Sequence, residues 1–387
     1  MKGSFVVLGG LVLCLAAPTL AHAQTPQKPQ NPFKLGGYVE AFYQWNFNNP
    51  SNGITNLRGF DNRHNSFTLS NVAFDVQWDY ENLIGHLTLQ VGHTPSTYYL
   101  GEPNQPGSSD ANASGAEVWK YLQQANAGYR FGLGRGLSVT AGLFVTAIGP
   151  ETLAVHENWN WSRSTLFFEL PYYHTGVRAS YPFSDAWTVE LAAYNGWNSV
   201  VDNNDEKSLS AQAIYTRSDV VFSALYFTGV ERDPGAAEGR AWRNLFDTHV
   251  TWHATPVLSL RAHGSGGFEP NEFGVSHWLA SALYARLQVL DPLFVAMRVD
   301  ALYENVAEEG AESASPIFVP SPWVSSVTAT LDYRPHERVS FRLEYRHDHA
   351  DSDLYFGGTV ARDATTGSFT PTRHTQNTLT LGATTWF

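Results

Sequence analysis

The chain has one cysteine, Cys14, which lies in the apolar N-terminal stretch and not in the body of the sequence. A lipoprotein signal would place a small residue directly before that cysteine, but Leu13 stands there. Removal of the N-terminal stretch on export would leave no cysteine, which excludes disulfide bonds and thiolate metal sites. The fold must therefore be stabilised by other forces.

Positive charge is also scarce. The chain has 24 Lys and Arg against 36 Asp and Glu, a formal net charge of −12. Because a nucleic-acid partner requires a basic surface, we exclude nucleic acid as a partner.

A third absence is that of long hydrophobic runs. Beyond residue 24, no apolar stretch reaches the roughly 20 residues that a membrane-spanning helix needs. A strand with lipid on one side and water on the other alternates between apolar and polar residues. The pattern to look for is therefore period two in segments of about ten residues.

The N-terminus has the features of a secretory signal peptide. Lys2 precedes an apolar run over 5–17, and Ala21-His22-Ala23 has the small-x-small form of a cleavage site. A membrane helix is the alternative, but the run is too short to span a bilayer. We predict a signal peptide over 1–23, a short periplasmic segment over 24–34 and a transmembrane β-barrel over 35–387.

Alternating segments recur along the whole barrel region. They predict sixteen strands, near 35–47, 67–79, 83–95, 120–131, 137–148, 172–182, 186–197, 207–217, 219–230, 244–254, 257–267, 276–289, 293–304, 322–334, 337–349 and 374–387. The last strand has Leu379, Leu381 and Phe387 on one face, and the chain ends on that aromatic residue. Such an ending resembles the signal by which the barrel-assembly machinery recognises outer-membrane barrels, so Phe387 is the predicted assembly signal.

The connections between these strands alternate strictly between short and long. Short ones carry turn residues, as in Asp79-Tyr80-Glu81-Asn82 and Asp291-Pro292, and long ones such as 48–65 and 350–373 are rich in Asn, Gly, Pro and Ser. We expect an all-β antiparallel transmembrane barrel with short periplasmic turns and long extracellular loops. A soluble two-sheet sandwich is the alternative, but it would not predict this regular alternation.

Several motifs resemble a known family, the OmpL-like β-barrel porin-2 group of outer-membrane porins. The motifs are GYVEAFY (37–43), NFN (46–48), IGPE (148–151), NWNWS (158–162), YHTGVR (173–178), YNGWN (194–198) and EYRHD (344–348). The resemblance implies a pore in the outer membrane, without naming the solute, and is compatible with a homotrimer.

A barrel of about sixteen strands is wide enough for an aqueous channel, so inward polar residues would set its selectivity. Strand parity predicts that the following residues face the lumen: Glu40, Asp75, Arg130, Arg178, Glu190, Arg261, Arg286, Arg298, Asp300, Arg342, Glu344 and Arg346. The arginines of the eleventh to fifteenth strands would form a basic arc. Alternatively, they pair with Asp300, Glu344 and Asp348 to stiffen the wall.

The loop 149–170 is long, aromatic and acidic. Its candidate constriction residues are Glu151, His156, Glu157, Trp159, Trp161, Arg163 and Glu169. The family resemblance implies that this loop folds into the barrel, and an ordinary surface loop is the alternative.

Other functions have weaker support. His249 and His263 could share a metal ion across neighbouring strands, but no third ligand is evident, so we predict neither metal nor cofactor. An outer-membrane hydrolase would need a serine and a histidine paired with a third, orienting residue, and the sequence shows no such set. We expect a porin for ions and small hydrophilic solutes, surrounded by outer-membrane lipid. A structural scaffold barrel is the alternative.

Overall fold

The computed structural model describes residues 31–103, 114–308, 314–317 and 321–387. The predicted signal peptide and most of the segment 24–34 lie outside the described residues. Phe33–Phe387 forms one compact unit and is described by itself. Among the described residues, no helix is both long and apolar enough to cross a membrane.

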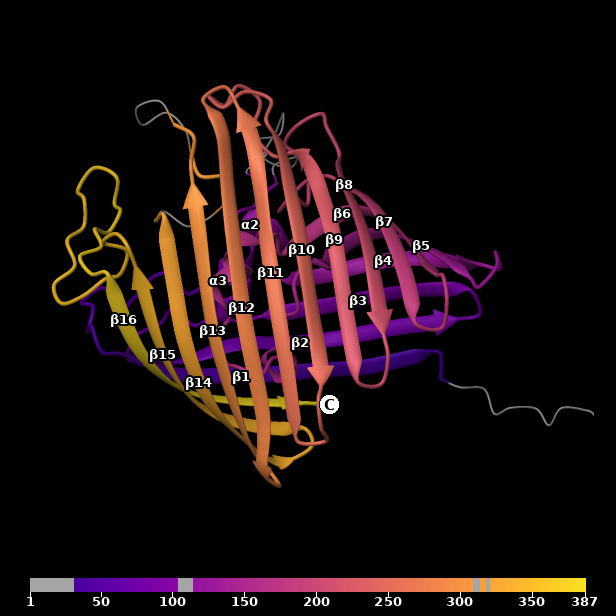
Figure 1. Ribbon diagram of the computed structural model, residues 1–387, viewed down its shortest axis with the longest axis horizontal. Helices are drawn as coiled ribbons and strands as arrows, with labels where there is room; N and C mark the ends of the chain where they lie inside the picture. The colour runs from indigo at the N-terminus through magenta and orange to yellow at the C-terminus, as the bar shows by residue number, and fades with distance from the viewer. Residues whose placement is uncertain (1–30, 104–113, 309–313, 318–320) are drawn as a thin grey trace, which may run out of the picture. The chain divides into compact units, whose positions relative to one another are not determined.

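Sixteen strands make up this unit (Figure 1). They are β1 Phe33–Asn46, β2 Ser66–Tyr80, β3 Leu83–Val91, β4 Leu122–Phe131, β5 Leu137–Val145, β6 Tyr173–Pro182, β7 Trp187–Tyr194, β8 Ser208–Thr216, β9 Val220–Val230, β10 Trp242–His253, β11 Leu258–Asn271, β12 Gly274–Leu290, β13 Leu293–Asn305, β14 Trp323–His336, β15 Val339–Ala350 and β16 Thr375–Trp386. Each pairs with its sequence neighbours, and β1 pairs with β16, which closes the barrel. The predicted closed antiparallel barrel of sixteen strands is confirmed.

The seam between β1 and β16 joins the two ends of the barrel sequence. Its antiparallel register runs from Tyr38 opposite Trp386 to Asn46 opposite Thr378. Beyond the last paired residues, the Phe387 amide donates to the Gly37 carbonyl at 3.1 Å. A Cβ at Gly37 would lie 2.6 Å from the Ala73 carbonyl oxygen, so only glycine fits under the C-terminal residue.

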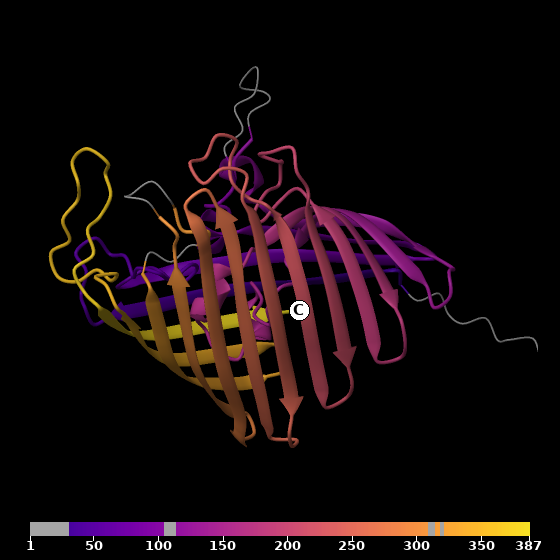
Figure 2. The same cartoon turned by 45° about the horizontal axis from the view of Figure 1, so that its top comes forward.

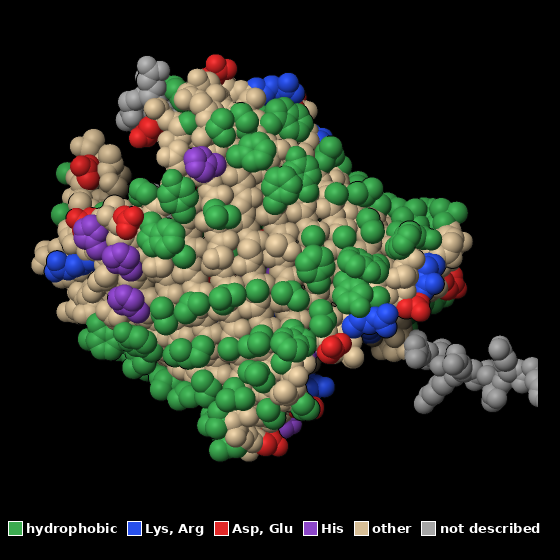
Figure 3. Space-filling model, in the orientation of Figure 1, with side chains coloured by type: hydrophobic (Ala, Val, Ile, Leu, Met, Phe, Trp, Pro, Cys, Tyr) green, Lys and Arg blue, Asp and Glu red, His purple; other side chains and the backbone are tan. Residues whose placement is uncertain are grey.

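Burial alternates along the strands with period two, as the sequence predicts. On β15, Phe341, Leu343 and Tyr345 are 41–47% exposed, whereas Arg342, Glu344 and Arg346 are at most 1% exposed. Hydrophobic side chains therefore cover the outer wall, and charged ones gather near the strand ends of the visible face (Figure 3). This is the distribution that a lipid-facing barrel wall requires.

Short turns lie at one end of the barrel and long connections at the other, here called the turn end and the loop end. The long connections carry short helical segments: α1 His93–Tyr98, α2 Ala116–Trp119, a 3₁₀ turn at Val155–Glu157 and α3 Thr165–Glu169. The third strand is shorter than predicted because Gly92, at φ 141°, turns the chain into α1. In Figure 2, turned by 45°, the long connections rise beyond the strand ends.

Candidate constriction and inner wall of the channel

The loop 149–170 lies inside the ring of strands. Its helix α3 packs against β12, β13 and β14, and its 3₁₀ turn packs against β16. Near the 3₁₀ turn, the Val155 amide donates to Glu40 of β1 at 2.5 Å, and the Trp161 amide donates to Glu344 of β15 at 2.6 Å. The loop is therefore bound to inward-facing residues on both sides of the β1–β16 seam.

Two arginines of the inner wall bind loop carbonyl oxygens. Arg342 donates to the carbonyls of Val155, Asn158 and Asn160 at 2.8–3.0 Å. Arg346 donates to the carbonyl of Arg163 and to the Ser162 hydroxyl. Both arginines are fully buried. Their donors are directed at the loop, whose carbonyls have no strand partner here.

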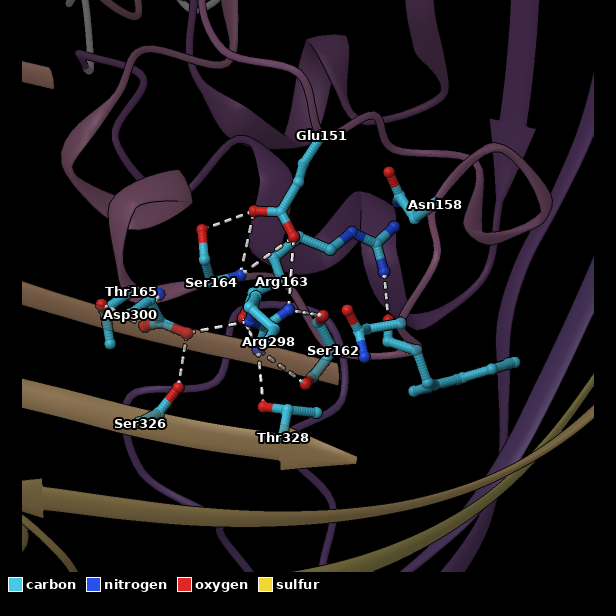
Figure 4. Close-up of polar contacts among 12 residues, drawn as sticks. Glu151, Asn158, Ser162, Arg163, Ser164, Thr165, Arg298, Asp300, Ser326 and Thr328 are labelled. Carbon is cyan, nitrogen blue, oxygen red and sulfur yellow. Dashed lines mark hydrogen bonds and ion pairs between the residues drawn. The ribbon is translucent and has the colours of Figure 1, made fainter. Parts of the chain in front are cut away.

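Arg298 of β13 lies at the centre of a larger network (Figure 4). It donates to the Ser162 carbonyl at 2.6 Å and to the Arg163 carbonyl at 3.1 Å. Its guanidinium also contacts Asp300 at 2.8 Å and Glu151 at 3.3 Å. One buried cation thus binds a wall carboxylate, a loop carboxylate and the loop backbone.

Two wall carboxylates bind loop amides in the same way. Glu344 accepts from the amides of Trp161 and Ser162, at 2.6 and 2.9 Å. Asp300 accepts from the Thr165 amide at 2.9 Å. We name five residues the loop clamp: Arg298, Asp300, Arg342, Glu344 and Arg346. The three clamp arginines pair with carboxylates and bind loop backbone, so these three members of the predicted basic arc are not open to the lumen.

The seven predicted loop residues are in different environments. Arg163 is buried and donates to the carbonyls of Thr152 and Trp161, at 3.1 and 2.9 Å. It therefore links two parts of the same loop. Trp161 is fully buried and Trp159 is 7% exposed. His156 stacks on Trp386, with ring centroids 4.7 Å apart. Trp386, which closes β16, therefore points inward.

The three loop glutamates also differ. Glu151 is buried and accepts from the Ser164 amide at 3.0 Å and from the Ser164 hydroxyl. Glu169 is 1% exposed, and neither of its oxygens has a hydrogen-bond partner. Burial, with the nearby Asp247 carboxylate second, raises the pKa of Glu169 well above its ordinary value. Glu157 is exposed, so among these three it alone can present charge to water.

The remaining predicted wall residues pair outside the loop clamp. Arg178 lies 3.1 Å from Glu190, and Arg130 lies 2.9 Å from Asp79 in a largely exposed pair. Arg261 stacks 4.6 Å from the Trp159 ring and donates to the Pro150 carbonyl. Arg286 lies 3.7 Å from Asp332, and Asp75 accepts from Thr88 and lies 2.5 Å from the His86 imidazole.

Some important residues were not named in the sequence analysis. Asp332 is a buried partner of Arg342 at 3.6 Å, and the parity of β14 could have placed it inward. Asp348, which the sequence analysis names as a possible partner of the inward arginines, lies 2.6 Å from Arg346. Arg58, in the loop after β1, lies 3.0 Å from Asp61 and 3.3 Å from Asp348. No periodic pattern marks that loop, so nothing in the sequence indicated this pair.

The histidine pair on β10 and β11 contacts one carboxylate. His263 lies 2.6 Å from Asp247 and His249 lies 3.7 Å from it. Asp247 also accepts from the Gly149 amide at 3.2 Å, which anchors the first residue of the loop 149–170. Within the described ranges, no group of three or more His, Cys, Asp or Glu is placed to hold a metal ion.

Two separate cavities lie inside the barrel. One, of about 370 Å³, lies at the loop end and is lined by residues that include Arg58, Glu169, Trp197 and Arg243. The other, of about 310 Å³, lies at the turn end between the inner wall of β1–β4 and the loop 149–170. We call the second one the turn-end cavity. The two have no lining residue in common.

A closed antiparallel barrel with an apolar outer wall and a loop folded into its lumen defines the class of outer-membrane β-barrel channels. The chain belongs to the family described as "Putative beta-barrel porin-2, OmpL-like", whose model matches residues 32–387. It is therefore an outer-membrane porin, a channel and not an enzyme.

Solved porin structures share this fold at low sequence identity. Salmonella typhi OmpF, in complex with daunomycin, matches with a TM-score of 0.58 and 11% identity, over 92% of this chain and 97% of that one. A trimer form of Vibrio cholerae OmpT matches with 0.57 and 10%, over 92% and 99%. The channel DcaP of Acinetobacter baumannii matches with 0.56 and 12%, over 92% and 97%. No curated protein matches the chain in sequence.

Proposed function

We propose that this porin is a passive diffusion channel for ions and small hydrophilic solutes, and that the loop 149–170 forms its constriction. One observation supports this above all: the loop lies within the lumen, bound at its backbone by β1, β13 and β15. A segment fixed across the lumen narrows the path and sets the size of solute that passes. We further propose that the long connections face the outside of the cell and the short turns face the periplasm.

The charges of the inner wall support a modest selectivity. The clamp arginines are buried and paired, so their fields are largely cancelled before they reach a permeating ion. Glu157 is exposed, and none of the ion pairs among the described residues includes it. We propose that selectivity depends on such unpaired groups, and not on opposed basic and acidic walls.

Planar-bilayer recording of the purified protein tests the channel. We expect stepwise ion conductance that is ohmic at low voltage. A correctly folded barrel that carried no current would contradict passive diffusion and would favour the scaffold alternative.

We propose that residues 1–23 are a cleaved signal peptide and that Phe387 is the residue read by the barrel-assembly machinery. Phe387 is 61% exposed and follows the final strand on its outward face. Deletion of Phe387 should lower the amount of heat-modifiable barrel in the outer membrane, whereas Phe387→Tyr, which keeps the ring, should assemble normally. Normal abundance of the truncated protein would contradict the assembly role.

We also propose a homotrimer. Small residues on the outer wall of β8–β11, among them Ala211, Ala213, Gly264 and Gly266, form a shallow apolar depression with Phe246 and Leu279 at its rim. Close contact between copies would bury such a surface. Crosslinking of an Ala213→Cys variant tests this, because the described residues contain no other cysteine. A variant that stayed monomeric in detergent and in lipid would contradict the trimer.

A further inference from the structure

The turn-end cavity has the size of a small-molecule site. Its volume of about 310 Å³ falls at the lower end of the range for small-ligand pockets, roughly 300–1,000 Å³. Its wall comes from β1–β4 and β16 on one side and from the segment Thr152–Glu157 of the loop on the other. A solute crossing the barrel on this side would pass along its surface.

Side chains of β2, β3 and β4 form one polar network on this wall. Asp75 is its centre: it lies 2.5 Å from the His86 imidazole and accepts from Thr88 at 2.6 Å and from Gln77 at 3.2 Å. The Gln124 amide nitrogen donates to Thr88 at 3.3 Å. The network therefore holds Gln77 and Gln124 by their nitrogens.

The amide oxygens of Gln77 and Gln124 remain available. No described residue donates a hydrogen bond to either oxygen; Gln77 is exposed and Gln124 is half-buried. The two glutamines come from β2 and β4, and both line the cavity. Two acceptor groups held by a common network thus border the same small volume.

Aromatic rings line the other part of the cavity. His156 of the loop stacks on Trp386 at 4.7 Å with an interplanar angle of 14°. Tyr38 lies 5.6 Å from His156, and its hydroxyl contacts the Gln123 amide at 3.5 Å. The cavity thus combines flat apolar surfaces with fixed polar acceptors, which suits a ligand that has both C–H and O–H groups.

Charge decides between two classes of ligand. No Lys or Arg is among the described residues that line the cavity, so an anion has no counterion there. An organic cation would meet two carboxylates, Asp75 and Glu157. Both oxygens of Asp75 already accept hydrogen bonds from neighbouring side chains, and Glu157 is exposed, so water and salt screen its charge. Hydroxyl groups can donate to the two free amide oxygens without needing a charge.

We propose that the turn-end cavity is a binding subsite for a neutral polyhydroxylated solute of about the size of a monosaccharide. This inference rests on the proposed diffusion channel and names a solute class for it. Hydroxyls donate to the amide oxygens of Gln77 and Gln124, while the C–H face of the ring lies against the stacked His156 and Trp386.

Current recording with added glucose tests the subsite, because a neutral sugar carries no current and reduces ion flow only by occupying the path. We expect concentration-dependent block of the wild-type channel. The double variant Gln77→Ala, Gln124→Ala loses two hydrogen bonds, which should raise the half-blocking concentration by about tenfold. Asn126→Ala is the matched control, since Asn126 is an amide on β4 that does not line the cavity.

A second variant distinguishes loss of glucose binding from misfolding of the barrel. Gln124→Glu keeps the length of the side chain and an acceptor, so it should retain glucose block. Block of equal strength in wild type and in the double variant would contradict the subsite. So would block by benzylammonium but not by glucose, which would assign the acceptors to a cation. Absence of any ion current in the wild type would instead contradict the diffusion channel itself.

Discussion

The inner wall has two regions that differ in how they use polar side chains. On β13–β15, arginines and carboxylates are fully buried, and they form hydrogen bonds with one another and with the loop 149–170. On β2–β4, amides and hydroxyls surround a cavity of about 310 Å³, and some of their polar atoms stay unbonded. The arginine-rich region holds the constriction, and the amide-rich region around Asp75 faces the space that is left for solute.

This difference shows that a charged residue on a channel wall does not by itself act on the permeating ion. A buried guanidinium that binds carbonyl oxygens fixes the shape of the lumen, and its charge is compensated locally. A half-exposed amide has no net charge, yet it can exchange hydrogen bonds with a solute. The contrast between the regions is open to test by changing one region at a time.

The largest effect is expected from the loop clamp. Arg342→Ala would leave the loop carbonyls of Asn158 and Asn160 without a recorded donor, at a cost of about 1–3 kcal/mol for each to the loop in its bound position. The Val155 carbonyl and Asp332 would each lose one of several partners. Single-channel conductance should rise several-fold and become noisy as the loop leaves the wall. Arg130→Ala is the control, because its pair with Asp79 is largely exposed and is worth at most about 1 kcal/mol. Equal conductance in the two variants would refute the clamp.

A smaller effect should separate two buried glutamates of the loop. Glu151→Gln weakens contacts to Ser164 and Arg298, so thermal stability should fall and conductance should become heterogeneous. Glu169→Gln removes no recorded hydrogen bond, and the raised pKa of this carboxyl favours its neutral form, so at or below the ordinary pKa of Glu both measurements should stay near wild type. The opposite order of the two variants would mean that their environments are assigned wrongly.

Glu169 also predicts a pH dependence. Its pKa is raised in the native state, so the native protein holds that proton more tightly than the unfolded chain does. This contribution to stability is therefore fully present below the ordinary pKa of Glu and declines as the pH rises above it. As the pH rises above the ordinary pKa of Glu, wild type should therefore lose stability relative to Glu169→Gln in thermal unfolding. Parallel curves for the two proteins would contradict this prediction.

The smallest effect is expected from Glu157. At about 10 Å in water, one unit charge contributes about 0.4 kcal/mol, which is about a twofold change in ion preference. Glu157→Gln should therefore shift the reversal potential slightly toward anions, and only at low ionic strength. A large shift would indicate that Glu157 lies at the narrowest point of the path.

The sequence predicted the strands well because a barrel strand must alternate, and the alternation is visible without any knowledge of the partner strand. The same parity placed Arg298, Arg342 and Arg346 on the inside. Parity does not show which groups these arginines contact inside the barrel. Their partners are backbone carbonyls of the loop 149–170, whose sequence has no periodic pattern. Glu151 and Glu169 were alike in sequence, and only the packed loop separates them. Gln77 and Gln124 also have inward parity, but an uncharged amide gives no signal of its own.

The clamp has a consequence for the order of assembly. The contacts of Thr165 with Asp300 and of Trp161 with Glu344 join residues 135 and 183 positions apart, and the later partner always belongs to a strand near the C-terminus. Strands that pair with their immediate neighbours can form early, whereas contacts at such separation must wait for the chain to be nearly whole. The loop can take its place only after β13–β15 have joined the sheet. Narrowing of the lumen is thus a late event, and an unfinished barrel would be a wider opening than the finished one.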